Sequence, residues 1–406
     1  MPWPPTPPPL GSVSSSRYAG SIIAITAAVL AFAPGLNAAD GSEFGASGIS
    51  LSASAYQAPA VSSPNGLDKA QDSAPAHGYT AGQRRTMADY NATLQKTFTK
   101  GLALEPVESK YRPYADYEAT GYLIMSSNFD FNSTQAKLEM ARNLPADATL
   151  VIFADNPDAF TKEDILRAYE GVVPRARIKV ISLPRARQGF WARDGIPVPV
   201  IGKDNTLTVV DAVYGHGFEP DAEIARLFKT GLEKHRYYYE GGNFMANHTG
   251  ACLMVNHGAH VKIPDEIFTG LYGCKEMIRL PFVDGIGHID EHARFISEKV
   301  LVTDIAQYKD VLQGKGFTVH MLPKPSGPYE TYANSLLMND KVIVPVFGRD
   351  TDKQALAVYE SLGLKATGAD SKSLSNNGQG SVHCITMTYP RVPAAELMKA
   401  LGAREL

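Results

Sequence analysis

The sequence has no long run of lysine and arginine, and its acidic and basic residues nearly balance. It carries 39 Lys and Arg residues against 42 Asp and Glu residues, which gives a formal net charge of −3 and a pI near 6.4. Proteins that bind nucleic acid usually present a basic patch, because phosphate contacts supply much of their affinity. The composition therefore argues against nucleic acid as a partner.

Cysteine is scarce, with three residues in 406, and no Cys-x-x-Cys pair occurs. Zinc sites often use close ligand spacings of that kind, so we expect no metal and no other cofactor. In an oxidising compartment an odd number of cysteines leaves one thiol over. Cys252 and Cys274 could pair while Cys384 stays reduced. Equally, the first two could be small buried apolar residues.

The amino terminus lacks the ~20 consecutive apolar residues that a membrane span needs. Its apolar stretch, residues 22–32, follows Arg17 and precedes a Pro34-Gly35 break and the small residues of Asn37-Ala38-Ala39. This order is typical of a secretory signal with a cleavage site. We therefore predict a signal peptide over 1–39 and a secreted protein, extracellular or periplasmic, with no stable membrane association after cleavage. A single-pass anchor is the alternative.

Residues 40–78 are rich in Ser, Ala, Gly and Pro and have few charges, which predicts a flexible linker. Apolar residues then recur at helical spacing from Met87 to Phe98, so an amphipathic helix is expected to open the folded part. No second linker follows. We therefore predict one catalytic domain over residues 79–406.

Within that domain, short β-rich runs alternate with amphipathic segments, which indicates an α/β fold. The expected strands are 121–125, 149–154, 178–183, 207–213, 252–256, 277–282, 295–304, 317–322, 335–338 and 342–346. The expected helices are 135–142, 162–169, 221–234, 305–314 and 352–362. Asn339-Asp340, between two apolar runs, is typical of a hairpin turn.

Four short segments far apart in the chain together offer one thiol, one imidazole and three carboxylates. They are Trp191-Ala192-Arg193-Asp194, Glu240-Gly241-Gly242-Asn243, Gly287-His288-Ile289-Asp290 and Ser381-Val382-His383-Cys384-Ile385-Thr386. A guanidinium is planar and stays protonated up to about pH 12, so a pocket that buries it must supply matched negative charge. This set of side chains therefore predicts an enzyme that acts on arginine-like substrates.

The chemistry assigns a role to each of five residues. Asp194 and Asp290 would hold the cation, and Cys384 would attack its central carbon. His288 would protonate the departing nitrogen and then activate water, while Glu240 orients that imidazole. Each residue alone has a plainer explanation, such as a solvated or capping carboxylate, a core cysteine or a structural histidine. Their occurrence together favours catalysis.

The order of these motifs resembles the guanidino-group-modifying family, in the branch that contains agmatine deiminase and the Porphyromonas-type peptidylarginine deiminase. The resemblance runs from about Gly121 to the C-terminus. It implies a five-bladed, pseudo-symmetric α/β propeller, or pentein, with the active site at its centre. It also implies metal-independent hydrolysis of a guanidine to a urea and ammonia through a covalent cysteine intermediate.

The same resemblance matches the family's guanidinium-binding carboxylates to Asp194 and Asp290, its acid/base histidine to His288 and its nucleophile to Cys384. Residues expected around the substrate are Trp191 as an aromatic wall, Asn334 as the family's active-site asparagine, Asn243 in a turn that shapes the pocket, and Glu219.

Signals for the substrate conflict. Secretion and the sequence of residues 241–245 resemble the peptidylarginine branch, whereas Glu240 and the compact length resemble agmatine deiminase. No arginine lies between Gly195 and Ala225 to grip a terminal carboxylate, and Glu219 in this stretch favours an amine or a neutral peptide bond. We expect conversion of peptidylarginine, in a peptide or protein, to peptidylcitrulline plus ammonia.

Three alternatives remain. The first is hydrolysis of a small guanidino compound, agmatine, to N-carbamoylputrescine. The second is a Cys-His amide hydrolase, which would need backbone donors for an oxyanion but no pair of carboxylates. The third is a secreted guanidinium-binding protein without turnover.

Overall fold

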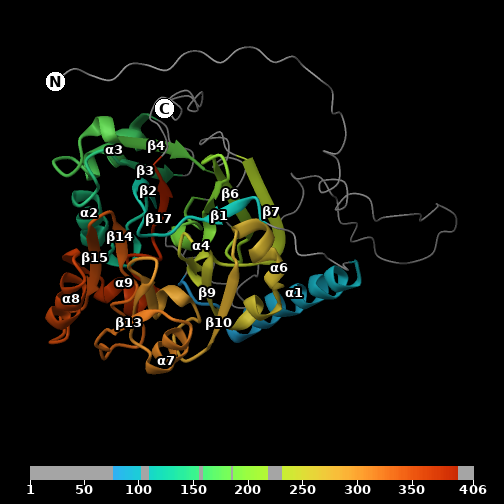
Figure 1. Cartoon of the computed structure of the whole chain (residues 1–406). Helices are drawn as coiled ribbons and strands as arrows, with labels where there is room; N and C mark the ends of the chain where they lie inside the picture. The colour runs from blue at the N-terminus through green and yellow to red at the C-terminus, as the bar shows by residue number, and fades with distance from the viewer. Residues whose placement is uncertain (1–75, 102–108, 155–158, 184–185, 218–230, 392–406) are drawn as a thin grey trace, which may run out of the picture. The chain divides into compact units, whose positions relative to one another are not determined.

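The computed structural model describes residues 76–101, 109–154, 159–183, 186–217 and 231–391 (Figure 1). The predicted signal peptide lies outside these residues, as does the predicted linker apart from residues 76–78. Helices and strands alternate along the described chain, which confirms the α/β class. In these parts of the chain, no helix is both long enough and apolar enough to span a membrane.

The described strands form five small sheets of three or four strands each. The four-stranded sheets have the orders β17 (Met387–Pro390), β2 (Thr120–Ser126), β3 (Thr149–Ala154), β4 (Ile178–Ser182), and β1 (Tyr111–Pro113), β5 (Val198–Gly202), β6 (Leu207–Val213), β7 (Gly231–Tyr238). The three-stranded sheets have the orders β10 (Glu276–Pro281), β9 (Ala251–Asn256), β8 (Met245–Ala246); β11 (Ala293–Phe295), β12 (Val300–Thr303), β13 (Thr318–Met321); and β14 (Leu336–Met338), β15 (Lys341–Val346), β16 (Lys365–Asp370).

One pairing pattern recurs in all five sheets: a strand has an antiparallel neighbour on one side and a parallel neighbour on the other. Thus β12 pairs antiparallel with β11 and parallel with β13, and β15 does the same with β14 and β16. Parallel neighbours need a crossover connection, which is usually a helix. Outside the connection from β6 to β7, which includes residues that the structure does not describe, a helix accordingly lies between each pair of parallel strands.

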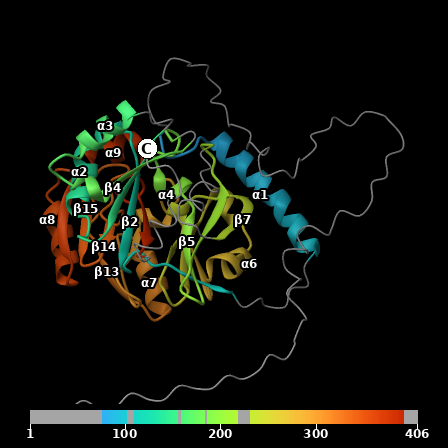
Figure 2. The same cartoon turned by 90° about the horizontal axis from the view of Figure 1, so that it is seen from above.

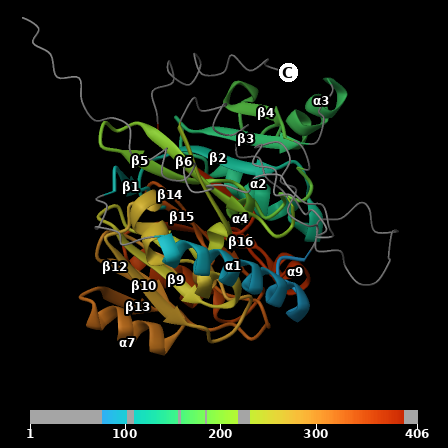
Figure 3. The ribbon, with the colours of Figure 1, turned by 90° about the vertical axis from the view of Figure 1, so that its right-hand side faces the viewer.

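The helices are α1 (Ala81–Gly101), α2 (Thr134–Arg142), α3 (Ala159–Ala168), α4 (Ala192–Gly195), α6 (Asp265–Ile267), α7 (Ala306–Gly314), α8 (Asp352–Ser361) and α9 (Lys372–Gly378). Of these, α7 connects β12 to β13, and α8 connects β15 to β16. The opening helix α1 packs against β7 and the turn Gly258–Lys262 (Figure 2). Figure 3 shows β2, β3 and β4 side by side, with α3 next to β4.

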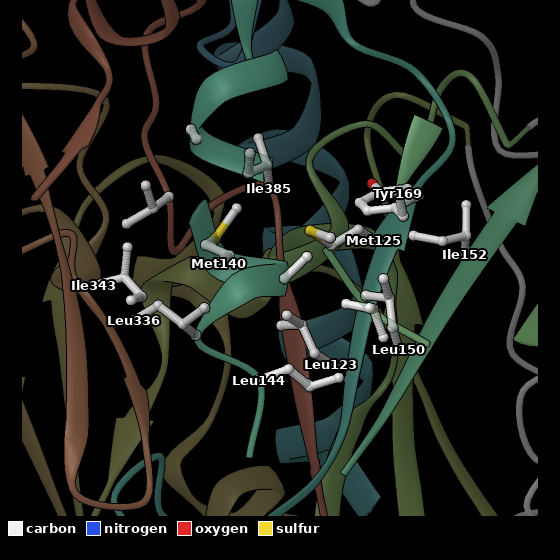
Figure 4. Packing of buried hydrophobic residues seen from close by; sticks show 14 of the residues in the cluster. Leu123, Met125, Met140, Leu144, Leu150, Ile152, Tyr169, Leu336, Ile343 and Ile385 are labelled. Carbon is white, nitrogen blue, oxygen red and sulfur yellow. The ribbon is translucent and has the colours of Figure 1, made fainter. Parts of the chain in front are cut away.

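A hydrophobic core joins the sheet of β2 to the sheet of β15 and reaches the loop that carries Cys384 (Figure 4). It contains Leu123 from β2, Met140 from α2, and Ile343 from β15, all fully buried. Ile385 packs into the same cluster directly after Cys384. Burial of a side chain of this size contributes about 1.5–3 kcal/mol, so this contact fixes the main chain beside the thiol.

Most expected elements are present. The predicted opening helix falls within α1, and Asn339 forms the turn between the antiparallel strands β14 and β15 with a positive φ of 60°. Two predictions are wrong. Residues 295–304 do not form one strand, because β11 and β12 fold back on each other. In the expected helix 221–234, residues 231–234 belong to β7, where pairing with β6 overrides local propensity; residues 221–230 lie outside the described residues.

A disulfide joins Cys252 and Cys274, while Cys384 is free and buried. Cys252 lies on β9, and Cys274 lies just before β10, the parallel neighbour of β9. Of the two alternatives for these cysteines, the structure has the bonded one. The thiol that the chemistry requires is therefore the one left over.

Candidate active site

Cys384 lies in a hydrogen-bonded turn between α9 and β17, where Thr386 N donates to His383 O at 3.1 Å. Its sulfur receives a hydrogen bond from Asn334 Nδ2 at 3.0 Å and lies 3.6 Å from Asp290 Oδ2. Burial and the charge of Asp290 raise the pKa of the thiol to about 12, against the opposing effect of His77. A bound cation is therefore needed to make the thiolate at neutral pH.

The carboxylates of Asp194 and Asp290 are buried and face a common point. Asp194 belongs to the short helix α4, and its Oδ1 accepts a hydrogen bond from Gly242 N at 2.8 Å. A Cβ atom added to Gly242 would lie 2.8 Å from Asp194 Oδ1, 2.8 Å from His288 Nδ1 and 3.3 Å from Asp290 Oδ1. The backbone of Gly242 thus forms a wall that all three groups approach, which only a residue without a side chain allows.

His288 is paired with Glu240. His288 Nε2 lies 3.0 Å from Glu240 Oε2, and its Nδ1 lies 3.8 Å from Asp194 Oδ1. Burial would lower the pKa of His288, but the charges of Asp194 and Glu240 outweigh that effect and raise the pKa to about 10. Burial would likewise raise the pKa of Glu240, but His288 holds it at about 2. At neutral pH the pair is therefore an imidazolium and a carboxylate.

Of the four residues expected around the substrate, the structure describes three, and each has a different environment. Trp191 is fully buried beside the site, and Asn334 contacts the sulfur rather than open space. The amide of Asn243 hydrogen bonds the main chain of Val255 in both directions, at 2.8 and 2.9 Å, and its oxygen also accepts from Ile289 N at 3.2 Å. Asn243 thus holds the loop that carries His288. Glu219 lies outside the described residues.

A buried polar network behind Asp290 was missed by the sequence analysis. His383 Nδ1 donates to Asp290 Oδ2 at 2.7 Å, while Arg294 Nη1 donates to His383 Nε2 at 2.7 Å and to Asp116 Oδ2 at 2.8 Å. Burial together with the charges of Arg193 and Arg294 lowers the pKa of His383, which keeps its ring neutral. The hydrogen bond from His383 holds the pKa of Asp290 below its usual range, although burial opposes this.

His77 was also missed, since it falls near the end of the predicted linker. Its ring is fully buried and stacks on Trp191, with centroids 4.4 Å apart and planes 14° from parallel. Its Nε2 contacts Asp194 Oδ2, and its ring meets His288 edge-on at 5.2 Å. No spacing in the sequence relates His77 to the four motifs.

Among the residues that the structure describes, two groups of three buried side chains could hold a metal ion, because their candidate ligand atoms lie within 4.8 Å of one another. One is His77, Asp194 and His288, and the other is Glu240, His260 and His288. Folding therefore brings together imidazole and carboxylate atoms that the sequence spacing does not. Because His288 is shared and is already paired with Glu240, it could serve only one group at a time.

The arrangement can bind a flat cation and act on it. It offers two carboxylates for the charge, an aromatic wall for the flat face, a thiol for the central carbon and an imidazolium as proton donor. An amide hydrolase would need backbone amides aimed at an oxyanion, and none of these four groups requires such donors.

Comparisons with known proteins agree with this geometry. The family model for Porphyromonas-type peptidyl-arginine deiminase matches residues 130–390. A substrate-bound agmatine deiminase variant from C. jejuni is 18% identical with a TM-score of 0.59, over 69% of this chain and 96% of that chain. Agmatine deiminase from Enterococcus faecalis is 18% identical with a TM-score of 0.57, over 70% of this chain and 96% of that chain.

At these identities the solved structures establish the shared fold only. Among curated proteins, none matches this sequence. The family model, in contrast, spans more than half of the chain and includes every motif that the sequence analysis singled out. The chain belongs to the Porphyromonas-type peptidyl-arginine deiminase family, whose members are hydrolases that act on carbon–nitrogen bonds.

Proposed function

We propose that this protein hydrolyses the guanidino group of peptidylarginine to peptidylcitrulline and ammonia, with Cys384 as the nucleophile. One observation carries the proposal: the sulfur of Cys384 lies 3.6 Å from a carboxylate oxygen of Asp290, in a buried site that also holds Asp194 and the His288–Glu240 pair. Two buried carboxylates beside a thiol have no use in amide hydrolysis, but they match a guanidinium in charge.

In the first step, the bound guanidinium stabilises the thiolate of Cys384, whose proton passes to solvent as the substrate binds, and the sulfur attacks the central carbon. A carbon–sulfur bond forms and gives a tetrahedral adduct. His288, protonated because its pKa is raised to about 10 by Asp194 and Glu240 against the effect of burial, donates its proton to one nitrogen. That carbon–nitrogen bond breaks, ammonia leaves, and a thiouronium remains on the cysteine.

In the second step, the now neutral His288 takes a proton from water, and the hydroxide attacks the same carbon. The new hydroxyl group loses its proton to solvent as the carbon–oxygen double bond forms. The carbon–sulfur bond breaks, its electron pair restores the thiolate, and the product carries a urea group. Glu240 holds the imidazole in place through its 3.0 Å hydrogen bond, and Asn334 donates to the sulfur at 3.0 Å. Each proton and electron pair is accounted for without a cofactor, so we propose none.

Peptidylarginine is our first choice of substrate because the family model carries that activity in its description. Agmatine is the second, since the C. jejuni and E. faecalis proteins are agmatine deiminases. Glu219, whose charge would favour the amine of agmatine or a neutral peptide bond, remains a proposed substrate contact. A guanidinium-binding protein without turnover is the candidate from another class.

We further propose that the five sheets are the blades of a five-bladed α/β propeller. The recurrence of one antiparallel and one parallel neighbour in each sheet supports this arrangement. Export through a signal peptide over residues 1–39 also remains a proposal, as does the linker over 40–78 except at its end, where His77 and Gly78 are held in the site by hydrogen bonds. The disulfide between Cys252 and Cys274 supports export, because such bonds persist in oxidising compartments.

A colorimetric assay for the urea group, which citrulline and N-carbamoylputrescine share, tests the function, run with a peptide that has internal arginine, with agmatine and with free arginine. The expected result is fastest turnover of the peptide, release of ammonia, and loss of activity in Cys384→Ala. Turnover of agmatine alone would overturn the choice of substrate. Asp194→Asn separates a deiminase from an amidase, because only the deiminase should lose about 10²-fold or more in kcat/KM. Tight binding of these compounds without ammonia release would favour the binding protein.

A further inference from the structure

The guanidinium position proposed above is filled by a side chain of the protein itself. The His77 ring lies flat on Trp191, its Nε2 contacts Asp194, and it interacts with Cys384. These are the aromatic wall, a carboxylate and the sulfur that a substrate guanidinium would meet. An imidazole is planar and can carry one positive charge, so it resembles a guanidinium in shape and charge.

The surroundings of His77 favour its protonated, positively charged form. Burial would lower the pKa of His77, but the charge of Asp194 and the contacts with Asp194 and Cys384 outweigh burial and raise the pKa well above its usual value. With the ring in place, the cavity between it and the Glu240–His288 pair is only about 20 Å³, lined also by His257 and His260. That volume admits about one water molecule and excludes a guanidino group.

Three residues at the edge of the site, His216, Gly378 and Gln379, hold the main chain of His77 and Gly78. His77 N donates to Gly378 O at 2.8 Å, and His77 O lies 3.2 Å from His216 Nε2. Gly78 N donates to Gln379 Oε1 at 3.1 Å. These three residues therefore hydrogen bond to successive peptide groups, as a site that binds an extended polypeptide does. Agmatine has no peptide group that could use these partners.

The chain leaves the site into a helix that is fixed in place. Thr80 and Gln83 form reciprocal hydrogen bonds at the start of α1, at 2.9 and 3.3 Å. Asn91 of α1 donates to Tyr238 O and Ala259 O, both at 2.9 Å. Residues 77–79 are thus tethered beside the site at high local concentration, so they compete effectively with a ligand from solution.

We propose that residues 77–79 are a built-in occupant of the active site, and that His216, Gly378 and Gln379, which hold their main chain, are the subsite for the main chain of a polypeptide substrate. An arginine within a peptide and His77 would then compete for one place. This inference rests on the proposed function for the identity of the ligand. The occupancy itself can be tested without turnover.

The first test measures how fast iodoacetamide alkylates Cys384, the free thiol of the full-length chain. His77→Ala and His77→Ser, whose small side chains leave the site open, should each accelerate alkylation by about tenfold or more, because the occupied fraction protects the sulfur; this gain should outweigh the loss of the effect by which His77 lowers the pKa of the thiol. His320→Ala, a half-buried histidine on β13, is the matched control and should react like the parent. If both His77 variants fold and react at the parent rate, the occupancy proposal is overturned.

The second test measures binding in the Cys384→Ala background, with a blocked Gly-Arg-Gly peptide and with agmatine as probes. His77→Ala should tighten both by a similar factor, since it removes the competitor. His216→Ala and Gln379→Asn each remove one hydrogen bond from the occupant and from the bound peptide alike, so peptide affinity should change little while agmatine, which loses only its competitor, binds about 3–10-fold tighter. Asparagine suits position 379 because the backbone there has a positive φ of 69°. Equal effects on both probes would overturn the main-chain subsite.

A third measurement needs no change at His77. Peptide binding to the Cys384→Ala chain should speed hydrogen exchange of the Gly78 amide, which now donates to Gln379. Unchanged exchange at saturating peptide would overturn the occupancy.

If these binding and alkylation results appear but no citrulline is ever formed, the occupant stands and the proposed hydrolysis fails. If citrulline is formed while His77 variants leave alkylation, exchange and KM unchanged, the reverse holds.

Discussion

The side-chain amide of Asn334 donates a hydrogen bond to the sulfur of Cys384 at 3.0 Å. The amide cannot turn freely, because its oxygen accepts from the main-chain nitrogen of His383 at 3.1 Å. A donor fixed in this way stabilises a thiolate more than a thiol. Asn334 thus stabilises the thiolate with a neutral group, and the bound cation supplies the rest of the stabilisation.

Replacing Asn334 with leucine removes this donor at nearly constant volume. We expect kcat for the preferred substrate to fall by about 10²–10³-fold with a small change in KM, as for loss of a donor to a developing anion. Steady-state citrulline release measures it. Asn377→Ala, at an exposed asparagine of α9, should behave like the parent. A kcat for Asn334→Leu within threefold of the parent would show that the amide does not act on the sulfur.

Gly242→Ala should abolish activity without unfolding the protein. Its Cβ would lie 2.8 Å from both Asp194 Oδ1 and His288 Nδ1, so these groups must move apart. A displacement of this kind at a catalytic site costs about 10²-fold or more in rate. Gly314→Ala on α7 is the matched control, because no atom lies within 4 Å of the added Cβ there. Full activity of Gly242→Ala would mean that the three groups are not used in the arrangement described above.

Activity should fall as pH rises through the pKa of His288. That pKa is raised to about 10 by Asp194 and Glu240 against the effect of burial, and the protonated ring is the form that donates to the leaving nitrogen. Glu240→Gln removes one of the raising charges, so the alkaline limb of the kcat profile should move to lower pH by about one unit or more. Glu276→Gln, at an exposed ion pair with Lys315, should leave the profile unchanged. An unmoved alkaline limb in Glu240→Gln would refute the pairing.

Removing the disulfide should destabilise the protein but spare its chemistry. The bond closes a loop with a sequence separation of 22 residues. A loop of that size implies roughly 3 kcal/mol of stabilisation in the chain-entropy model. The double variant Cys252→Ser/Cys274→Ser should lose about that much in denaturant unfolding, while the citrulline assay below the transition stays near the parent value. A reductant should destabilise Cys384→Ala as much as the parent, since residue 384 takes no part in the bond.

Much of the fold could be predicted from the sequence, because buried strands carry apolar runs. The strand β3 was expected over the range that it occupies, and β2 and β15 were expected to within a residue at each end. Two failures share a cause. The segment β7 reads as helical from its charged residues, and the turn within 295–304 follows no proline or glycine; in both, pairing with a distant strand decides the conformation.

The site was predictable as a set of residue types but not as a set of contacts. Cys384, His288, Asp194 and Asp290 were singled out because a buried guanidinium needs their chemistry. The sequence did not indicate the residues that act through these four. Asp116, for example, contacts Arg294 and His383, and both lie so far from it in the sequence that no spacing rule relates them. His77 could not be inferred, since a histidine in a Ser- and Gly-rich stretch resembles any exposed polar residue.

The intact mass of the protein after acid quench, during turnover of a peptide that contains arginine, tests directly whether the sulfur of Cys384 forms a covalent intermediate with the substrate. A fraction of the parent chain should carry the peptide, less ammonia, on Cys384. Cys384→Ala should form neither this adduct nor citrulline. Citrulline formed by Cys384→Ala at the parent rate, with no adduct on the parent at any quench time, would rule out Cys384 as the nucleophile.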